Sequence, residues 1–223
     1  MHFRNRREAG QQLAKALSYL RGTKDTVVLG IPRGGVVVAY EVATALDVPL
    51  DVYIARKIGA PYNPELAIGA VTSDGTVWID EMLAQHVGAD RDYIDAEVKR
   101  QRDEIERRMN VYHPEGEIVP LENQRVVLVD DGIATGATVL VSLRALRKRE
   151  PKELILAVPV GPVETIAMLE NECDRVVCLH AATLFWAVGA FYDDFDQTSD
   201  REVVQLLESA RKRQKPCGES APS

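Results

Sequence analysis

Hydrophobic positions along the chain form two alternating patterns. Short apolar runs rich in β-branched residues predict buried strands, and stretches in which apolar residues recur every three or four positions predict helices. The predicted strands are 26–31, 49–56, 125–131, 152–160 and 174–180. The predicted helices are 6–19, 36–46, 136–150, 163–172 and 199–213.

Three further segments break this alternation. Residues 57–65, KIGAPYNPE, have the glycine, proline and asparagine content of a loop, and residues 66–80 predict two short strands around an Asp-Gly turn. Residues 90–109 are highly charged, with only a narrow apolar stripe. That pattern predicts a long exposed helix within a helical insertion at about 80–117.

Strands that alternate with helices at this spacing predict βαβ units. The expected fold class is therefore α/β, a mostly parallel twisted sheet with helices on both faces. We expect a single domain over residues 1–215, with its core at about 24–180 and a small C-terminal hood formed by about 181–215 with the N-terminal segment. Residues 216–223 are expected to be a disordered tail. Ligands of such sheets bind beyond the carboxyl ends of the strands.

Composition and charge narrow the range of functions. With 223 residues, 46% of them hydrophobic and 27% charged, the chain fits one α/β domain. A net charge of −7 opposes non-specific nucleic-acid binding, so the basic clusters 4–7 and 144–149 are interpreted as solvated helix faces. No apolar run approaches the roughly 20 residues of a membrane span, and the charged N-terminus is unlike a secretory signal. We therefore expect a cytoplasmic protein without nucleic-acid or membrane partners.

The stretch VVLVDDGIATGAT, residues 126–138, holds the clearest candidate chemistry. A buried strand leads into Asp130 and Asp131, and a turn of small and hydroxyl-bearing residues then enters a helix. Backbone N–H groups at such a helix start bind anions. Adjacent carboxylates would repel the same anion, so they must bind hydroxyl groups or a divalent cation instead. A sugar phosphate satisfies both halves, whereas the alternative, a plain structural helix start, leaves the two acids unexplained.

Two other strand ends add basic residues. The strand that ends at Ile31 leads into PRGG, with Arg33, and the strand that includes Ala55 leads into RKIGAP, with Lys57. In a parallel sheet these ends and the end at Val129 open on one edge. The alternative for Lys57 is a surface lysine that reaches into solvent.

These three motifs together resemble the type I phosphoribosyltransferases. VVLVDDGIATGAT resembles the family signature, GIPRGG at 30–35 is similar to its pyrophosphate loop, and RK at 56–57 stands where members hold a basic residue. The resemblance covers roughly 26–177. With PELAIGAV and the late AVGAFYDDFDQTSDREV, the whole chain resembles a bacterial group of predicted phosphoribosyltransferases whose acceptor is generally unassigned.

The resemblance implies transfer of the phosphoribosyl group from 5-phosphoribosyl-1-pyrophosphate (PRPP) to a nitrogenous acceptor, with Mg²⁺ and release of pyrophosphate. Asp130 and Asp131 would hold the ribose hydroxyls and, through them, the metal. Arg33 and Lys57 would act on the leaving group. The implied PRPP-binding residues are Arg33, Gly34, Gly35, Lys57, Asp130, Asp131, Ala134, Thr135, Gly136, Ala137 and Thr138.

The acceptor is harder to predict. Family members that act on hypoxanthine or guanine usually have an acid at the position of Ala134, which argues against a standard 6-oxopurine enzyme. The hood carries aromatic and acidic residues that suit a flat ring, and the candidate acceptor residues are Phe185, Trp186, Tyr192 and Asp193. The alternative is that these aromatics are ordinary core.

Two other functions remain open. A protein that binds PRPP as a sensor or regulator would keep the same ligand site without transferase activity. A helix start without any phosphate ligand is the weaker alternative. The sequence also leaves open whether the chain forms a homo-oligomer.

Overall fold

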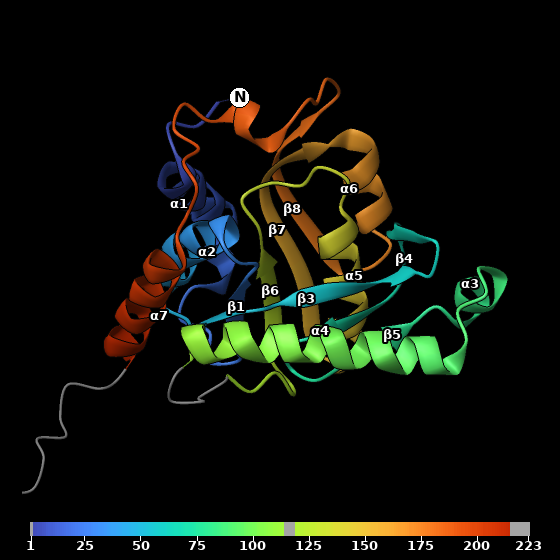
Figure 1. Cartoon of the computed structure of the whole chain (residues 1–223). Coiled ribbons are helices and arrows are strands. Elements are labelled where there is room, and N and C mark those ends of the chain that lie inside the picture. Colours follow the sequence, from blue (N-terminus) through green and yellow to red (C-terminus); the bar gives the residue numbers. More distant parts are fainter. Residues whose placement is uncertain (1, 114–118, 215–223) are drawn as a thin grey trace, which may run out of the picture.

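A five-stranded, wholly parallel sheet forms the centre of the computed structural model, which describes residues 2–113 and 119–214 (Figure 1). The strand order is β2-β1-β6-β7-β8. The strands are β1 (Thr26–Gly30), β2 (Leu50–Val52), β6 (Arg125–Val129), β7 (Glu153–Pro162) and β8 (Arg175–Ala182). The predicted α/β class and parallel sheet are confirmed. The predicted tail, 216–223, lies outside the described residues.

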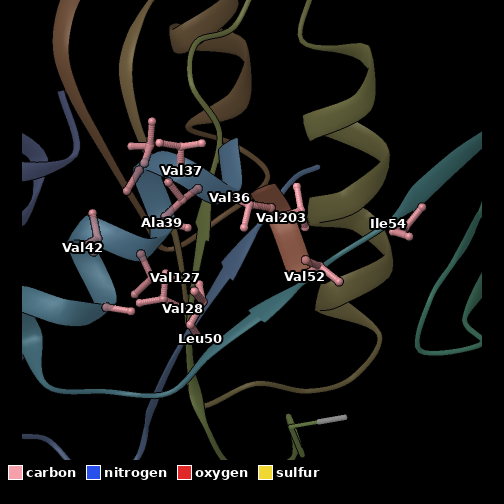
Figure 2. Packing of buried hydrophobic residues seen from close by; sticks show 14 of the residues in the cluster. Val28, Val36, Val37, Ala39, Val42, Leu50, Val52, Ile54, Val127 and Val203 are labelled. Carbon is pink, nitrogen blue, oxygen red and sulfur yellow. The ribbon is translucent and has the colours of Figure 1, made fainter. Parts of the chain in front are cut away.

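Helices cover both faces of this sheet. Alternate strand residues point to opposite faces, so that Val127 and Val129 of β6 join one core and Val126 and Leu128 join the other. The helices of the first core include α1 (Arg6–Ala16), α2 (Gly34–Leu46) and α7 (Asp200–Gln214). Those of the second are α5 (Ala137–Arg147) and α6 (Val163–Leu169). Figure 2 shows the first core, where α2 packs its valines onto the strands.

The strand order places one reversal in the sheet, between β1 and β6. From β1 the chain adds β2 on one side, and β6, β7 and β8 then extend the sheet on the other. A crevice outside the carboxyl ends of the strands at such a point is where open α/β sheets bind ligands. The loops that flank it are the PRGG loop after β1 and the acidic loop after β6.

The predicted strand 49–56 is wrong as a single unit, because it divides between two sheets. After β2, the Tyr53 N–H still donates to Gly30, but Ile54 accepts from Ser73 in a separate antiparallel sheet. That sheet has the order β3-β4-β5. Its strands are β3 (Ala55–Ala60), β4 (Asn63–Thr72) and β5 (Val77–Ile79). The apolar run continues across the change because both flanking segments are buried, so the pattern does not mark it.

Most of the predicted loop 57–65 is therefore strand, in the hairpin of β3 and β4. The predicted pair of short strands in 66–80 is confirmed by β4 and β5, which join through Gly75 at φ +81°. Asp74 accepts from the Thr76 N–H in the same turn. An Asp-Gly pair favours this turn because glycine adopts positive φ without a steric cost.

The predicted charged helix is confirmed as α4 (Arg91–Tyr112), which follows the short helix α3 (Glu81–His86). It lies across the antiparallel sheet in Figure 1 and buries only Gln101, Ile105 and Tyr112. The Tyr112 hydroxyl is 2.7 Å from the Asp200 carboxylate at the start of α7. No helix in the described part of the chain is long and apolar enough to cross a membrane.

The two ends of the described chain meet in a short strap, which we define as residues 2–6 with 191–196. Phe3 pairs with Tyr192 in a parallel bridge, and the Asp193 N–H donates to the Phe3 carbonyl at 2.9 Å. The strap follows the 3₁₀ helix η2 (Val188–Phe191) and forms a small core of its own around Phe3. In Figure 1 the start of the described chain lies beside this orange segment, above the carboxyl ends of the strands.

Candidate functional site

Asp130 and Asp131 follow the last residue of β6 and meet the PRGG loop across the switch point. A Cβ atom on Gly34 would stand 1.9 Å from the Asp131 carboxylate, and one on Gly35 would stand 2.8 Å from that of Asp130. Only glycine fits at both positions. The peptide bond between Pro32 and Arg33 in this loop is cis. The structure thus brings together two predicted motifs that lie about 100 residues apart in the sequence.

The two carboxylates are in different electrostatic environments. The Asp131 N–H donates to Asp130 Oδ1 at 2.8 Å. Burial raises the pKa of the Asp130 carboxyl well above its usual value, and the neighbouring charge of Asp131 raises it further. Keeping Asp130 ionised here therefore requires positive charge nearby.

Arg6 supplies that charge, and sequence reasoning missed it. Its Nε lies 2.7 Å from Asp131 Oδ2, and the two side chains are only 12% and 15% exposed. The prediction that the whole cluster 4–7 is a solvated helix face is therefore wrong at Arg6. The reason is that α1 packs against α2 beside the PRGG loop, which directs this one arginine inward. No local spacing pattern links residue 6 to residue 131.

The hood packs against the acidic loop, the segment after β6 that carries Asp130 and Asp131. The Tyr192 hydroxyl donates to the Asp131 carbonyl at 2.6 Å, and burial raises the pKa of this tyrosine. A Cβ on Gly132 would stand 2.4 Å from Val188 of η2. These contacts make the hood a support for the acids, whatever else it binds.

The four predicted acceptor residues lie in different surroundings. Tyr192 is 5% exposed and lies against Phe3 and Phe195. Phe185 stacks on Phe191 with 5.3 Å between ring centroids, and the Asp193 carboxylate is 2.7 Å from His2. Trp186 is 91% exposed. Three of the four therefore have partners within the hood or strap, and the Trp186 ring faces solvent.

The loop predicted to bind an anion, residues 132–138, is called the anion loop below. It leads into α5 through Gly136, which has φ +75°. No side-chain cap satisfies this helix start, apart from a long 3.5 Å contact from the Ala137 N–H to the Thr135 hydroxyl. Ala134, Thr135, Ala137 and Thr138 are all exposed. The start of α2 at Gly34 likewise has no side-chain cap. Both helices at the switch point thus present unsatisfied N–H groups.

Other helix starts in the described chain differ. Asn5, Asp80 and Asp90 cap α1, α3 and α4 with their side chains. The short helix α6 begins at Pro162 without such a cap. The carboxyl edge of the sheet therefore combines two uncapped longer helices, which suits anion binding by backbone amides and the helix dipole.

A cavity of about 520 Å³ opens beside the anion loop. Thr135, Ala137 and Thr138 line one side, and Arg56 and Lys57 of β3 line another. Residues of α4 complete the wall: Tyr93, Glu97, Arg100 and Gln101. The expectation that Lys57 follows a strand of the parallel sheet is wrong, because it lies within β3. It nevertheless shares a cavity with the anion loop, whereas Arg33 does not line this cavity.

Comparison with known proteins agrees with the resemblance seen in the sequence. Residues 4–196 match the model of the "Phosphoribosyl transferase domain". The Mycobacterium tuberculosis H37Rv protein "Putative phosphoribosyl transferase Rv0571c" is 43% identical over 210 residues, which are 94% of this chain and 47% of that protein. The crystal structure of TT1426 from Thermus thermophilus is 42% identical, with a TM-score of 0.86, covering 94% of this chain and 99% of that one. The chain spans about half the length of the curated relatives it matches.

Proposed function

Because this chain belongs to the phosphoribosyl transferase domain family, we propose that it transfers the 5-phosphoribosyl group from PRPP to a nitrogenous acceptor and releases pyrophosphate. One observation supports this most strongly. A single loop carries two adjacent carboxylates, Asp130 and Asp131, directly before an uncapped helix start at Gly136. Ribose 5-phosphate presents hydroxyl donors and an anion at matching positions.

The hydroxyl half of this proposal depends on the lone pairs left on the two acids. Asp130 Oδ1 accepts from the Asp131 N–H, and Asp131 Oδ2 accepts from Arg6. Within the described residues, no hydrogen-bond donor reaches Asp130 Oδ2 or Asp131 Oδ1. Each carboxylate thus retains one oxygen that can accept from a ribose hydroxyl.

The phosphate half depends on the start of α5. A helix dipole alone contributes only about 0.3–1 kcal/mol per anion. Useful affinity therefore requires several bonds at once, from the N–H groups of residues 134–138 and the hydroxyls of Thr135 and Thr138. Lys57 and Arg56 add positive charge in the adjoining cavity.

The transfer itself requires no nucleophilic side chain. The acceptor nitrogen attacks C1 of the ribose, and the bond from C1 to the pyrophosphate oxygen breaks, so its electron pair leaves with pyrophosphate. Arg33, the N–H groups of Gly34 and Gly35, and Lys57 would neutralise that growing charge. Removing one such preorganised group typically costs about 10²–10³ in rate.

Magnesium fits the donor set, because Mg²⁺ commonly binds through one or two carboxylates together with substrate phosphates. In the described part of the chain, no cluster of three or more His, Cys, Asp or Glu side chains could hold a metal ion alone. Asp130 and Asp131 would hold the metal indirectly, through the ribose hydroxyls of bound PRPP. When bound, the metal would neutralise pyrophosphate oxygens.

The acceptor is proposed only by class. Ala134 provides no acid for a 6-oxopurine, and the exposed ring of Trp186 is the hood aromatic with the most free surface. Replacing Trp186 with Ala should raise the KM for the acceptor and leave PRPP affinity unchanged. Weaker PRPP affinity with an unchanged KM for the acceptor would contradict a role of the hood in acceptor binding.

Pyrophosphate release from PRPP and Mg²⁺, measured over a panel of nitrogenous bases and amines, tests the proposed transfer. Release that depends on one acceptor class supports a transferase. PRPP binding at micromolar concentration without product from any acceptor favours the sensor, the alternative that the same site allows. Absence of PRPP binding would contradict both functions.

A further inference from the structure

Arg6 lies outside every motif that suggested the site, yet it contacts the centre of it. We infer that Arg6 is a positioning residue of the ribose site, which orients the Asp131 carboxylate and offsets its charge, so that PRPP affinity depends on the N-terminal helix. This inference rests on the proposed function. It concerns a residue at the start of α1, more than 120 positions away from the acid in the sequence.

The contact itself is close and shielded from water. Arg6 Nε donates to Asp131 Oδ2 at 2.7 Å, with both side chains less than one-fifth exposed. Charge-assisted hydrogen bonds of this length are about twice as strong as neutral ones. An exposed surface pair, in contrast, contributes little because water screens it.

The guanidinium is fixed by three further groups. Its carbon lies 3.8 Å from the centre of the Phe195 ring, and Nη1 donates to the Asp196 carbonyl at 2.7 Å. A Cβ on Gly34 would stand 2.7 Å from Arg6 Nε. Phe195 and Asp196 of the strap and Gly34 of the PRGG loop thus contact the arginine together, and a planar guanidinium suits this combination of stacking and bonding better than an ammonium.

This arrangement explains how two neighbouring carboxylates remain usable at a site for an anionic ligand. The arginine occupies one oxygen of Asp131 and offsets its charge. That leaves Oδ1 as the acceptor, in an orientation set by the Nε bond on the other oxygen. Without Arg6, Asp131 could rotate, and its uncompensated charge would lie next to Asp130.

Two other arginines of the same segment serve as matched controls. Arg7 pairs with Glu41 at 2.9 Å, but its side chain is 50% exposed. Arg4 is 78% exposed and lies 3.5 Å from Glu8. Neither contacts an acid of the loop, so each controls for loss of a positive charge near the N-terminus.

Calorimetric titration of PRPP with Mg²⁺ into the full chain tests the inference. We expect Arg6→Gln to weaken PRPP affinity at least tenfold and Arg6→Lys to recover part of that loss. Arg7→Gln should stay within about twofold of the wild type. A double-mutant cycle combines Arg6→Gln with Asp131→Asn. The double variant should bind PRPP no more weakly than Asp131→Asn alone, because both changes remove the same interaction.

Three results would overturn the inference. The first is that Arg6→Gln binds PRPP as tightly as the wild type or more tightly, and the second is that Arg6→Gln and Arg7→Gln lose equal affinity. The third is that the loss in the double variant equals the sum of the losses in Arg6→Gln and Asp131→Asn. If Arg6→Gln does not fold, Arg6→Lys against Arg7→Lys decides, with a threefold to tenfold loss expected only for the first. The PRPP affinity of the wild type distinguishes failure of the proposed function from failure of the inference about Arg6. Without wild-type PRPP binding the proposed function fails and the inference with it, whereas wild-type binding that Arg6→Gln retains overturns only the role of Arg6.

Discussion

Residues 130–133, the first half of the loop after β6, are held by contacts from the PRGG loop, the strap and η2, whereas residues 134–138 have few partners. Gly34 and Tyr192 touch the first half. In the second half, four of five residues are exposed and the helix start lacks a side-chain cap. One of the few hydrogen bonds that this second half makes is at the Ala134 carbonyl, which accepts from the Thr165 hydroxyl at 3.2 Å.

This difference shows how one loop serves two ligand groups. Carboxylates have to be oriented and partly neutralised by the protein before they can accept hydroxyl donors, because each costs free energy to bury unpaired. Backbone amides at a helix start need no such preparation, since their direction is fixed by the helix itself. Changes in the first half should therefore displace the acids, and changes in the second should weaken phosphate contacts alone.

The largest expected effect comes from Gly34→Ala. The added methyl would meet the Asp131 carboxylate and Arg6 together, so the acid must leave its position. PRPP affinity should fall about 100-fold, the upper end of the loss expected when hydrogen bonds to a charged group are broken. Titration with the folded variant measures this, and wild-type affinity would show that the contact across the switch point is not needed.

Gly136→Ala probes the second half and should weaken PRPP affinity about tenfold. An alanine at φ +75° costs roughly 1–2 kcal/mol, and its Cβ would stand 2.7 Å from Thr165. Gly88→Ala is the matched control, because Gly88 has φ +72° with open space around it. Both variants should unfold at lower temperature, and only Gly136→Ala should bind ribose 5-phosphate more weakly. Equal affinities of Gly136→Ala and Gly88→Ala for ribose 5-phosphate would contradict the assignment of the anion loop to the phosphate site.

A smaller effect, on stability, distinguishes functional from structural acids. The folded state raises the pKa of Asp130, so its ionisation costs stability as pH rises above the ordinary value for Asp. Asp130→Asn should therefore raise the Tm of the protein at pH 7, while PRPP affinity falls.

Asp174→Asn should act in the opposite direction. A hydrogen bond from Arg147 lowers the pKa of Asp174, so this acid contributes stability above its unfolded pKa that is lost as pH falls. Thermal unfolding between pH 4 and 8 measures both variants. A decrease in Tm for Asp130→Asn at pH 7 would contradict the view that this acid is kept for its function.

Much of the fold and the two central loops could be predicted because their signals are local. Parallel strands have continuous apolar runs, and the acids, the glycines and the hydroxyls of each motif lie within a few residues of one another. The chain order of strands and helices then places the motifs on one edge. Asp130, Asp131, Gly34 and Gly136 all follow from such local patterns.

The remainder depended on packing that no local pattern records. The change of sheet after Val52 occurs inside one apolar run, so Lys57 reaches the cavity from β3 rather than from the carboxyl edge of the parallel sheet. Arg6 has the sequence context of its solvated neighbour Arg7, and only the docking of α1 beside Gly34 separates their roles. Contacts between distant segments determine which charges are buried.

Affinity for PRPP with Mg²⁺ in Asp131→Asn, compared with Trp186→Ala by calorimetry, tests the central claim most directly. The amide keeps the shape of the side chain but loses an accepting oxygen and its charge. We expect affinity to fall about 100-fold in Asp131→Asn and to remain at the wild-type value in Trp186→Ala. Unchanged affinity in a folded Asp131→Asn variant would contradict the assignment of the acidic half of the loop to the ribose hydroxyls.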